Sequence, residues 1–464
     1  SPKPHNTLIA GRVAHTMVAH ASEKSSLLKG GEQDICLATT KRDAGCGDHT
    51  LRNFYTMAIL FSANRGCAVT GLSLATARLG AVGAWQSGVL SFSYMASTVL
   101  GATYIVKRFG GRNAMVTGMF LYCTYVGCFW AALRFPELEV PVALSGAAVG
   151  GLGAGLIWTA QGTYMAQAAK LHAKESFQDV TSATTSLAGG FAFIYLISEV
   201  CLRLMSTALA GFFTWESIFA IYTGIALSAA FGMLSVTDYG REKEDESNST
   251  SLFYKFTAGL QLLISNRKMK YMVGLNAVFG FTSAFLNTYV NGEVLKVALD
   301  DDKSVYVGAL TSWIALSAAL MSLILRRIPD TGAILVGGAI AFFFVAFPFI
   351  LYPDASQWTV TGLIAVYTLH GVGRSTFEST LRATFVDFFP NETAGAFSNI
   401  ILQYGLSSSI GYLLTFRLLC EDESAYCVEY SDSTLHDVLT FEVLVCLTAV
   451  LAIVGYWRAA SIHS

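Results

Sequence analysis

Long apolar stretches separated by short polar segments recur along most of the chain. A helix needs about 20 mostly apolar residues to cross a bilayer, and the pattern predicts twelve spans. The first, fifth and tenth of them are each interrupted by charge. The predicted spans are residues 54–74, 82–106, 113–133, 141–166, 180–203, 212–236, 271–290, 305–325, 332–352, 358–380, 394–416 and 437–457.

Two polar segments divide the chain into four parts. Residues 1–51 lack an apolar core, and a charged connector with REKEDESNST at its centre separates six spans from six. We therefore expect an N-terminal tail (1–51), a six-helix half (52–236), the connector (237–270), and a second six-helix half with a short tail (271–464).

An internal repeat supports two related halves. The run from Ser87 to Arg108 resembles the run from Val307 to Arg327 at an offset of 220 residues, and Gly151-Leu-Gly153 matches Gly371-Val-Gly373 at the same offset. Two related halves joined by a connector are the architecture of many secondary transporters. The predicted fold class is an all-α membrane protein with two pseudo-symmetric six-helix halves.

Composition agrees with a membrane protein. Only 13% of the residues are charged, whereas a soluble domain carries about 25%, so the chain cannot cover the surface of a soluble enzyme and the lipid bilayer is its expected environment. The net charge of −2 and the absence of basic runs with interleaved aromatics give no sign of nucleic-acid binding. Nine cysteines in a chain of this length do not make a disulfide scaffold.

The distribution of Lys and Arg predicts the orientation. With the N-terminus inside, 22 basic residues flank the inner side and six the outer side, and cytoplasmic flanks retain such residues. Both termini are therefore expected in the cytoplasm. The six outer residues are Arg78, Arg134, Arg203, Lys296, Lys303 and Arg417.

The candidate intramembrane charges are Arg65, Glu199, Arg374 and Glu378. A charge in the hydrocarbon region costs a few kcal/mol on insertion scales, and such residues usually mark pathways or buried pairs. Arg374 and Glu378 are four residues apart and can neutralise each other on one helix. Arg65 can pair with Glu378 or Glu199, which would hold the halves together.

Three stretches carry a resemblance to a known family: residues 79–122, residues 155–173 with WTAQGTY from Trp158 to Tyr164, and residues 371–407. On these motifs the chain resembles the Unc-93-like family of the major facilitator superfamily over most of residues 52–457. Between spans two and three the general superfamily pattern is D-R-x-G-R-K. The corresponding residues of this chain are Lys107, Arg108, Phe109, Gly110, Gly111 and Arg112, a form similar to that of the Unc-93-like family.

The resemblance implies a function in ion homeostasis or membrane assembly. Unc-93-like relatives include channel regulators, potassium-homeostasis proteins and trafficking chaperones. Arg374 stands where the family usually has an acidic residue in its tenth span, so shared ion or proton chemistry is not expected at that point. The sequence favours an accessory, regulatory or scaffold subunit of a channel, receptor or larger assembly, with an alternating-access transporter of a small solute or ion as the alternative.

The resemblance also indicates where a site would lie, because spans one, four, seven and ten line the central cavity of the superfamily fold. Two arginines against one glutamate there would favour an anion or a carboxylate-bearing solute. The alternative is that these charges form structural ion pairs without a ligand. The cavity candidates are Asn64, Arg65, Trp158, Gln161, Tyr164, Asn287, Tyr289, Arg374 and Glu378, and the expected cytoplasmic gate loop contains Lys107, Arg108, Gly110 and Arg112.

The other motifs do not indicate catalysis or a phosphate, metal or cofactor site. The glycines from Gly150 to Gly155 lie in an apolar span and fit close helix packing better than a phosphate loop. No zinc spacing, H-E-x-x-H or G-x-S-x-G element occurs, so neither an enzyme, a metal site nor a cofactor is predicted.

Two features outside the spans bear on location and partners. Cys420 and Cys427 lie in an expected outer loop, either as a disulfide or as free thiols. In the tail, Glu23, Leu27 and Leu28 match an acidic dileucine sorting signal, which would direct the protein to endolysosomal, vacuolar or plasma membranes. A long polar tail becomes ordered only when another structure binds it. We therefore expect a membrane-protein partner to bind and order this tail.

The orientation predicts that the sequons at Asn248 and Asn391 stay unglycosylated in a eukaryotic host, because both lie on the cytoplasmic side. Peptide-N-glycosidase should leave the electrophoretic mobility unchanged. A Glu429→Asn control, which creates a sequon in the expected outer loop, should acquire a glycan. A glycan on Asn248 would reverse the predicted orientation.

Overall fold

A computed structural model describes residues 46–240, 260–325, 327–328, 330–390, 392–418 and 435–463. These residues form helices joined by short turns, and strands are absent from the described ranges. The predicted all-α membrane architecture is confirmed. The helices of the N-terminal half are α3 (Cys46–Ser97), α4 (Thr103–Phe109), α5 (Gly111–Arg134), α6 (Glu139–Ser176), α7 (Val180–Ala210) and α8 (Trp215–Met233).

The C-terminal half repeats this pattern of long helices broken by short segments. Two of its long helices contain π-helical segments, η4 (Leu286–Val294) and η6 (Phe377–Leu381). Its helices are α10 (Arg267–Phe285), α11 (Leu295–Ala298), α12 (Val305–Leu325), α13 (Thr331–Leu351), α14 (Val360–Thr376), α15 (Arg382–Phe388), α16 (Thr393–Leu418) and α17 (Leu435–His463).

The first two predicted spans are two helices that meet at a sharp break inside α3, as the sequence predicted. Gly80 takes φ 52° and ψ −131°, which are not helical, and separates the two helices. This left-handed φ costs little only for glycine, which lacks a Cβ. A single non-helical residue therefore suffices to connect the two spans.

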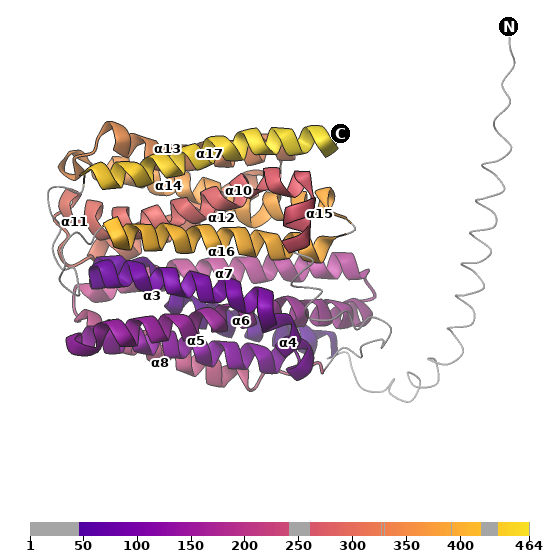
Figure 1. Cartoon of the computed structure of the whole chain (residues 1–464). Coiled ribbons are helices and arrows are strands. Elements are labelled where there is room, and N and C mark those ends of the chain that lie inside the picture. Colours follow the sequence, from indigo (N-terminus) through magenta and orange to yellow (C-terminus); the bar gives the residue numbers. More distant parts are fainter. Residues whose placement is uncertain are drawn as a thin grey trace, which may run out of the picture.

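The two halves lie side by side, with α3 and α7 of the first half packed against α16 and α12 of the second (Figure 1). The bundle has two ends. We call the end with α4 and α15 the connector end, because the chain leaves α8 there, and the opposite end the α11 end (Figure 1).

Eight helices of the described chain are long and apolar enough to cross a membrane. One of these helical segments covers both of the first two predicted spans. The helices α10, α14 and α16 are less apolar and are not among the eight. Those three helices bury Asn276, Arg374, Asn399 and Gln403. Their polar residues face the protein interior, which explains why their hydropathy is lower than that of the lipid-facing helices.

Glycines on α6 bring it close to α3 and α5. A Cβ on Gly151 would lie 2.4 Å from the Leu90 carbonyl oxygen, and one on Gly153 would lie 2.8 Å from the Gly118 carbonyl oxygen. Such close backbone approach is what small residues permit between membrane helices. The glycine run thus packs helices, as the sequence indicated.

We expect Gly151→Val to lower the stability of the protein by about 1–3 kcal/mol, because overpacking displaces α6 from α3. Gly162→Val is the matched control on the same helix, since no atom lies within 4 Å of a Cβ built there. Thermal unfolding in detergent would compare the two. Equal midpoints would show that the close approach at Gly151 is unimportant.

Candidate functional site

A cavity of about 1150 Å³ lies between the two halves. Its walls come from α3, α5, α6 and α7 on one side and from α10, α12, α14 and α16 on the other. The lining residues run from Arg203 and Asn287 near the α11 end to Ile328 and Arg382 near the connector end. The cavity therefore extends from the centre of the bundle toward the connector end.

Hydrogen bonds between the halves close the α11 end. Asn291 Nδ2 donates to the Ser73 carbonyl at 3.1 Å, and within the C-terminal half the Tyr367 hydroxyl donates to Asn291 Oδ1. Ser304 Oγ donates to the Ala77 carbonyl at 3.3 Å, and Trp215 Nε1 donates to the Lys303 carbonyl at 2.7 Å. Among the described residues, none of these bonded positions lines the cavity, which is therefore closed off from the α11 end in this conformation.

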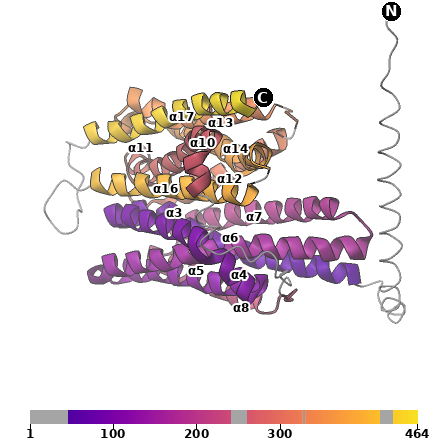
Figure 2. The same ribbon diagram turned by 45° about the vertical axis from the view of Figure 1, so that its right-hand side comes forward.

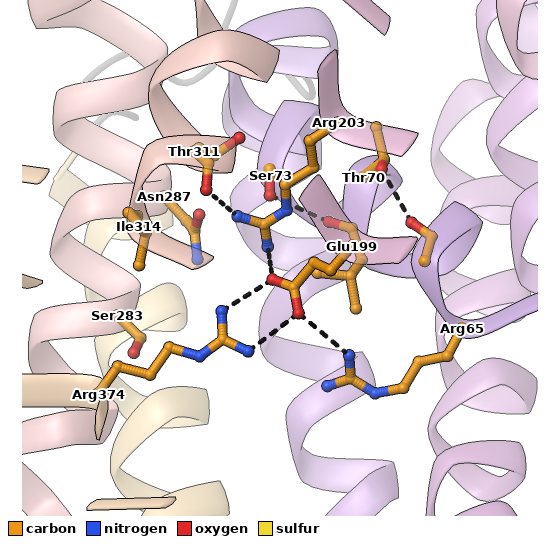
Figure 3. Close-up of polar contacts among 12 residues, drawn as sticks. Arg65, Thr70, Ser73, Glu199, Arg203, Ser283, Asn287, Thr311, Ile314 and Arg374 are labelled. Carbon is orange, nitrogen blue, oxygen red and sulfur yellow. Dashed lines mark hydrogen bonds and ion pairs between the residues drawn. The ribbon is translucent and has the colours of Figure 1, made fainter. Parts of the chain in front are cut away.

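The Glu199 carboxylate lies at the centre of the cavity wall and is shared by three guanidinium groups (Figure 3). Arg374 from the other half binds it in bidentate fashion, with Nη1–Oε1 at 2.8 Å and Nη2–Oε2 at 2.9 Å. Arg203 Nη2 lies 2.9 Å from Oε1, and Arg65 Nη1 lies 3.9 Å from Oε2. Bidentate arginine–carboxylate pairs are the strongest of these contacts.

The cluster carries excess positive charge. Glu378 accepts from Arg374 Nε at 3.0 Å, and its side chain is 36% exposed. Arg65, Arg203 and Arg374 thus face only two carboxylates, Glu199 and Glu378. A buried charge without a full partner is costly, so the cavity is electrostatically complementary to one further negative charge.

Several nitrogen atoms of the cluster lack a hydrogen-bond partner within the described chain. They are Arg65 Nε and Nη1, Arg203 Nε, and His370 Nδ1. The Arg65 guanidinium lies over both the Trp158 and Tyr195 rings, 5.0 Å and 4.9 Å from their centroids. These cation–π contacts hold Arg65 in place while leaving its donors unused, which is a suitable arrangement for binding an anion.

Of the nine cavity candidates, the structure brings five together on the cavity wall: Arg65, Trp158, Asn287, Arg374 and Glu378. Asn287 also donates to the Tyr412 hydroxyl at 3.0 Å. The sequence predicted that Arg65 pairs with Glu378 or Glu199; in the structure it lies nearest Glu199. Both the ion-pair arrangement and the cavity are therefore present at the same place.

The other four candidates do not line the cavity, so the expected site is corrected at these positions. Asn64 is fully buried and donates to the Ala226 and Met119 carbonyls on α8 and α5. Gln161 contacts Met165 one turn along its own helix. Tyr164 hydrogen-bonds Asn53 and the Thr237 carbonyl near the connector end. Tyr289 packs against Phe285 and Phe349.

Rotation about the helix axis explains these differences. Successive residues on a helix are 100° apart, so Asn64 points away from the cavity when its neighbour Arg65 points into it. The sequence identified the span that carries the site but did not fix which face of the span turns inward.

Arg203 lines the cavity, although it was not among the candidates predicted from the sequence. From its position at the end of a span, Arg203 was expected on the outer flank of the membrane. In the structure it is buried and pairs with Glu199. Its Nη1 donates to the Thr311 carbonyl at 2.7 Å. Without Arg203, five basic residues remain on the predicted outer side, so the distribution of Lys and Arg still predicts cytoplasmic termini. The spacing of four residues between Glu199 and Arg203 was the available signal.

The segment expected to form the cytoplasmic gate contains a tight turn. Lys107 and Arg108 lie in the last turn of α4, and Gly110 takes φ 85° before α5 begins. Arg112 Nη1 donates to the Leu234 carbonyl at 3.4 Å. The turn is thereby joined to the end of α8, and its role as a gate stays a prediction.

The remaining sequence features lie outside the described residues. These are the cysteines Cys420 and Cys427 and the tail residues Glu23, Leu27 and Leu28. Within the described ranges, no group of three or more His, Cys, Asp or Glu side chains could hold a metal ion.

Comparison with known proteins gives a family match. The model of the Major Facilitator Superfamily matches residues 54–412. A search of curated protein sequences gives no match.

Solved transporters share the fold at low sequence identity. The nucleoside transporter NupG is 12% identical with a TM-score of 0.61, covering 88% of this chain and 98% of its own. The inward-open xylose transporter XylE from E. coli is 15% identical with a TM-score of 0.58, covering 87% and 95%. The POT-family transporter PepTSo is 14% identical with a TM-score of 0.64, covering 89% and 99%. These likenesses establish the fold alone.

We expect Glu199→Gln to destabilise the protein by about 3–5 kcal/mol, because it leaves buried guanidinium groups without their shared carboxylate. Glu378→Gln is the matched control: it removes a contact with the same Arg374, but from a partly exposed side chain, and should cost at most about 1 kcal/mol. Thermal unfolding in detergent measures both. Equal losses would contradict the central role of Glu199.

Proposed function

Because the chain belongs to the major facilitator superfamily, we propose that it is a secondary transporter that moves a small organic anion by alternating access. We place it in the Unc-93-like branch on the motifs at Trp158 to Tyr164 and Lys107 to Arg112. The observation that carries the proposal is the cavity between the halves, which is lined by four arginines and two glutamates and in which Arg65 has unpartnered donors.

The positive cluster favours an anion as the transported solute. Arg65 and Arg374 both line the cavity from opposite halves, so one anionic group between them would bridge the halves. The aromatic rings of Trp158, Tyr195 and Tyr404 line the same space. They would supply apolar contact for the organic part of the solute.

The Arg374–Glu199 pair links solute binding to the conformational change. In the described conformation this pair joins the two halves near the closed α11 end. For the cavity to open there, the pair must separate, which would leave a buried Arg374 without a partner at considerable cost. An anion bound to Arg374 lowers that cost by taking the place of Glu199, so the loaded protein interconverts more readily than the empty one.

The expected orientation makes the described conformation inward-facing, since the connector end is the predicted cytoplasmic end. The bilayer as environment follows from the apolar helices and the family. We also propose that both termini are cytoplasmic, that the protein resides in an endolysosomal, vacuolar or plasma membrane, and that a partner binds the N-terminal tail.

The accessory role that the sequence favoured has less support. It depends on the N-terminal tail, of which residues 1–45 lie outside the described chain. The large cavity with excess positive charge instead supports the transporter alternative, because a scaffold does not require a central space of this size and polarity.

Benzenesulfonate tests the proposal, because it is an aromatic anion that stays ionised throughout the accessible pH range. Purified protein in proteoliposomes should take it up, and the similarly sized cation phenyltrimethylammonium should not be taken up. Arg65→Gln should raise the half-saturating concentration at least about tenfold, which corresponds to about 1.4 kcal/mol. Arg65 is the suitable position because its carboxylate contact is long, at 3.9 Å, so the fold should survive.

Arg134→Gln is the matched control, since Arg134 ends α5 outside the cavity and stacks on Phe135. Its uptake should equal that of the unmodified protein. Uptake of the cation at the same rate, or an Arg65→Gln variant with normal uptake, would refute anion transport.

A further inference from the structure

Helices α7 and α12 pack closely near the charged cluster and beyond it toward the α11 end. Arg203 Nη1 donates to the Thr311 carbonyl at 2.7 Å, and Thr207 Oγ1 donates to the Val305 carbonyl at 2.7 Å. A Cβ built on Gly308 would lie 2.4 Å from the Arg203 carbonyl oxygen. The helices run antiparallel here, so the pairing of Arg203 with Thr311 fixes their register.

That register places an apolar stretch of each helix side by side on the connector side of the cluster. Phe193 is ten residues before Arg203, or about 15 Å along the helix, and Leu320 is nine residues after Thr311, or about 13 Å. Phe193 and Leu320 therefore lie at nearly the same level. The same alignment brings Ile197 level with Leu316 and Ser317.

These apolar side chains line the cavity and are also strongly exposed. Phe193 is 70% exposed and Ile197 46%, while Leu320 is 52% and Leu323 58%, and all four belong to the cavity wall. Such exposure on cavity-wall residues of two neighbouring helices is what a side opening between α7 and α12 would produce, and Figure 2 shows this end of α7 projecting from the bundle.

These exposed side chains lie on helices that cross the bilayer, since both α7 and α12 are long and apolar enough to span a membrane. Apolar side chains at such positions are compatible with lipid chains, whereas an opening to water would favour polar side chains. The cavity wall thus carries a positive cluster at its centre and an exposed apolar stretch on the connector side of that cluster.

We propose that the solute is a single-chain amphipathic anion, with its charged head group at Arg65 and Arg374 and its alkyl chain passing out between α7 and α12. This inference rests on the proposed anion transport and specifies its substrate class. Charge complementarity at one end and the continuous apolar wall at the other select such a molecule over a small hydrophilic anion. The excess positive charge excludes a lipid with a cationic head group.

The inference is tested with decanesulfonate that carries a diazirine at its chain terminus, in protein reconstituted into nanodiscs. Photolysis and peptide mass spectrometry should find the label concentrated on α7 and α12, at Phe193, Ile197, Leu320 and Leu323. Arg65→Gln, or excess benzenesulfonate, should reduce that labelling at least about fivefold. Labelling spread equally over α8 and α17 and unaffected by Arg65→Gln would overturn the inference.

A second measurement uses a variant that narrows the gap. Ala192 lies on α7 in the cavity wall, and Ala192→Trp should raise the half-saturating concentration for decanesulfonate uptake at least about fivefold more than that for benzenesulfonate. Ala208→Trp is the matched control, an exposed position on the same helix outside the cavity wall, and should change neither. Equal changes for both probes would overturn the inference.

Different experimental outcomes would contradict the proposed anion transport and the proposed alkyl-chain path. If the unmodified protein takes up no benzenesulfonate, the proposed anion transport is contradicted. If it takes up benzenesulfonate but the decanesulfonate label is absent from α7 and α12, anion transport stands and the alkyl-chain path is contradicted.

Discussion

The Glu199 carboxylate, bound by Arg374 across the interface and by Arg203 on its own helix, is the interaction on which the rest of the structure depends. Three guanidinium groups inside a membrane bundle are tolerable only near compensating negative charge. Glu199 supplies most of that charge, and its bidentate contact with Arg374 joins the two halves at the centre of the bundle. The charge left over is what makes the cavity receptive to an anion.

The same interaction connects the open and closed ends of the cavity. Arg203 binds Glu199 with one nitrogen and the Thr311 carbonyl with another, so the cluster continues into the hydrogen bonds that close the α11 end. Two π-helical segments flank it, η4 with Asn287 and Asn291 and η6 with Glu378. Such segments are frequent at functional sites, and here they place polar side chains at the cavity and at its closed end.

Much of the fold followed from the sequence, because span length and Lys/Arg distribution are set by the bilayer itself. The tight junction at Gly80 did not, since hydropathy does not show how few residues connect two spans. The candidate site was harder: intramembrane charge pointed to Arg65, Arg374 and Glu378, which line the cavity, but it could not show that helix phase turns Asn64 toward α5 and α8. Arg203 was missed because it ends its predicted span, where an arginine normally reaches the interface.

The central claim is that an anion replaces Glu199 as the partner of Arg374 and thereby allows the α11 end to open. The most direct test is the distance between spin labels at Gln178 and Arg327, two exposed positions near the connector ends of the opposite halves, measured by double electron–electron resonance in a cysteine-depleted background. Saturating benzenesulfonate should increase the population with a shorter distance as the connector end closes. An unchanged distance distribution under conditions where the anion is bound would contradict the claim.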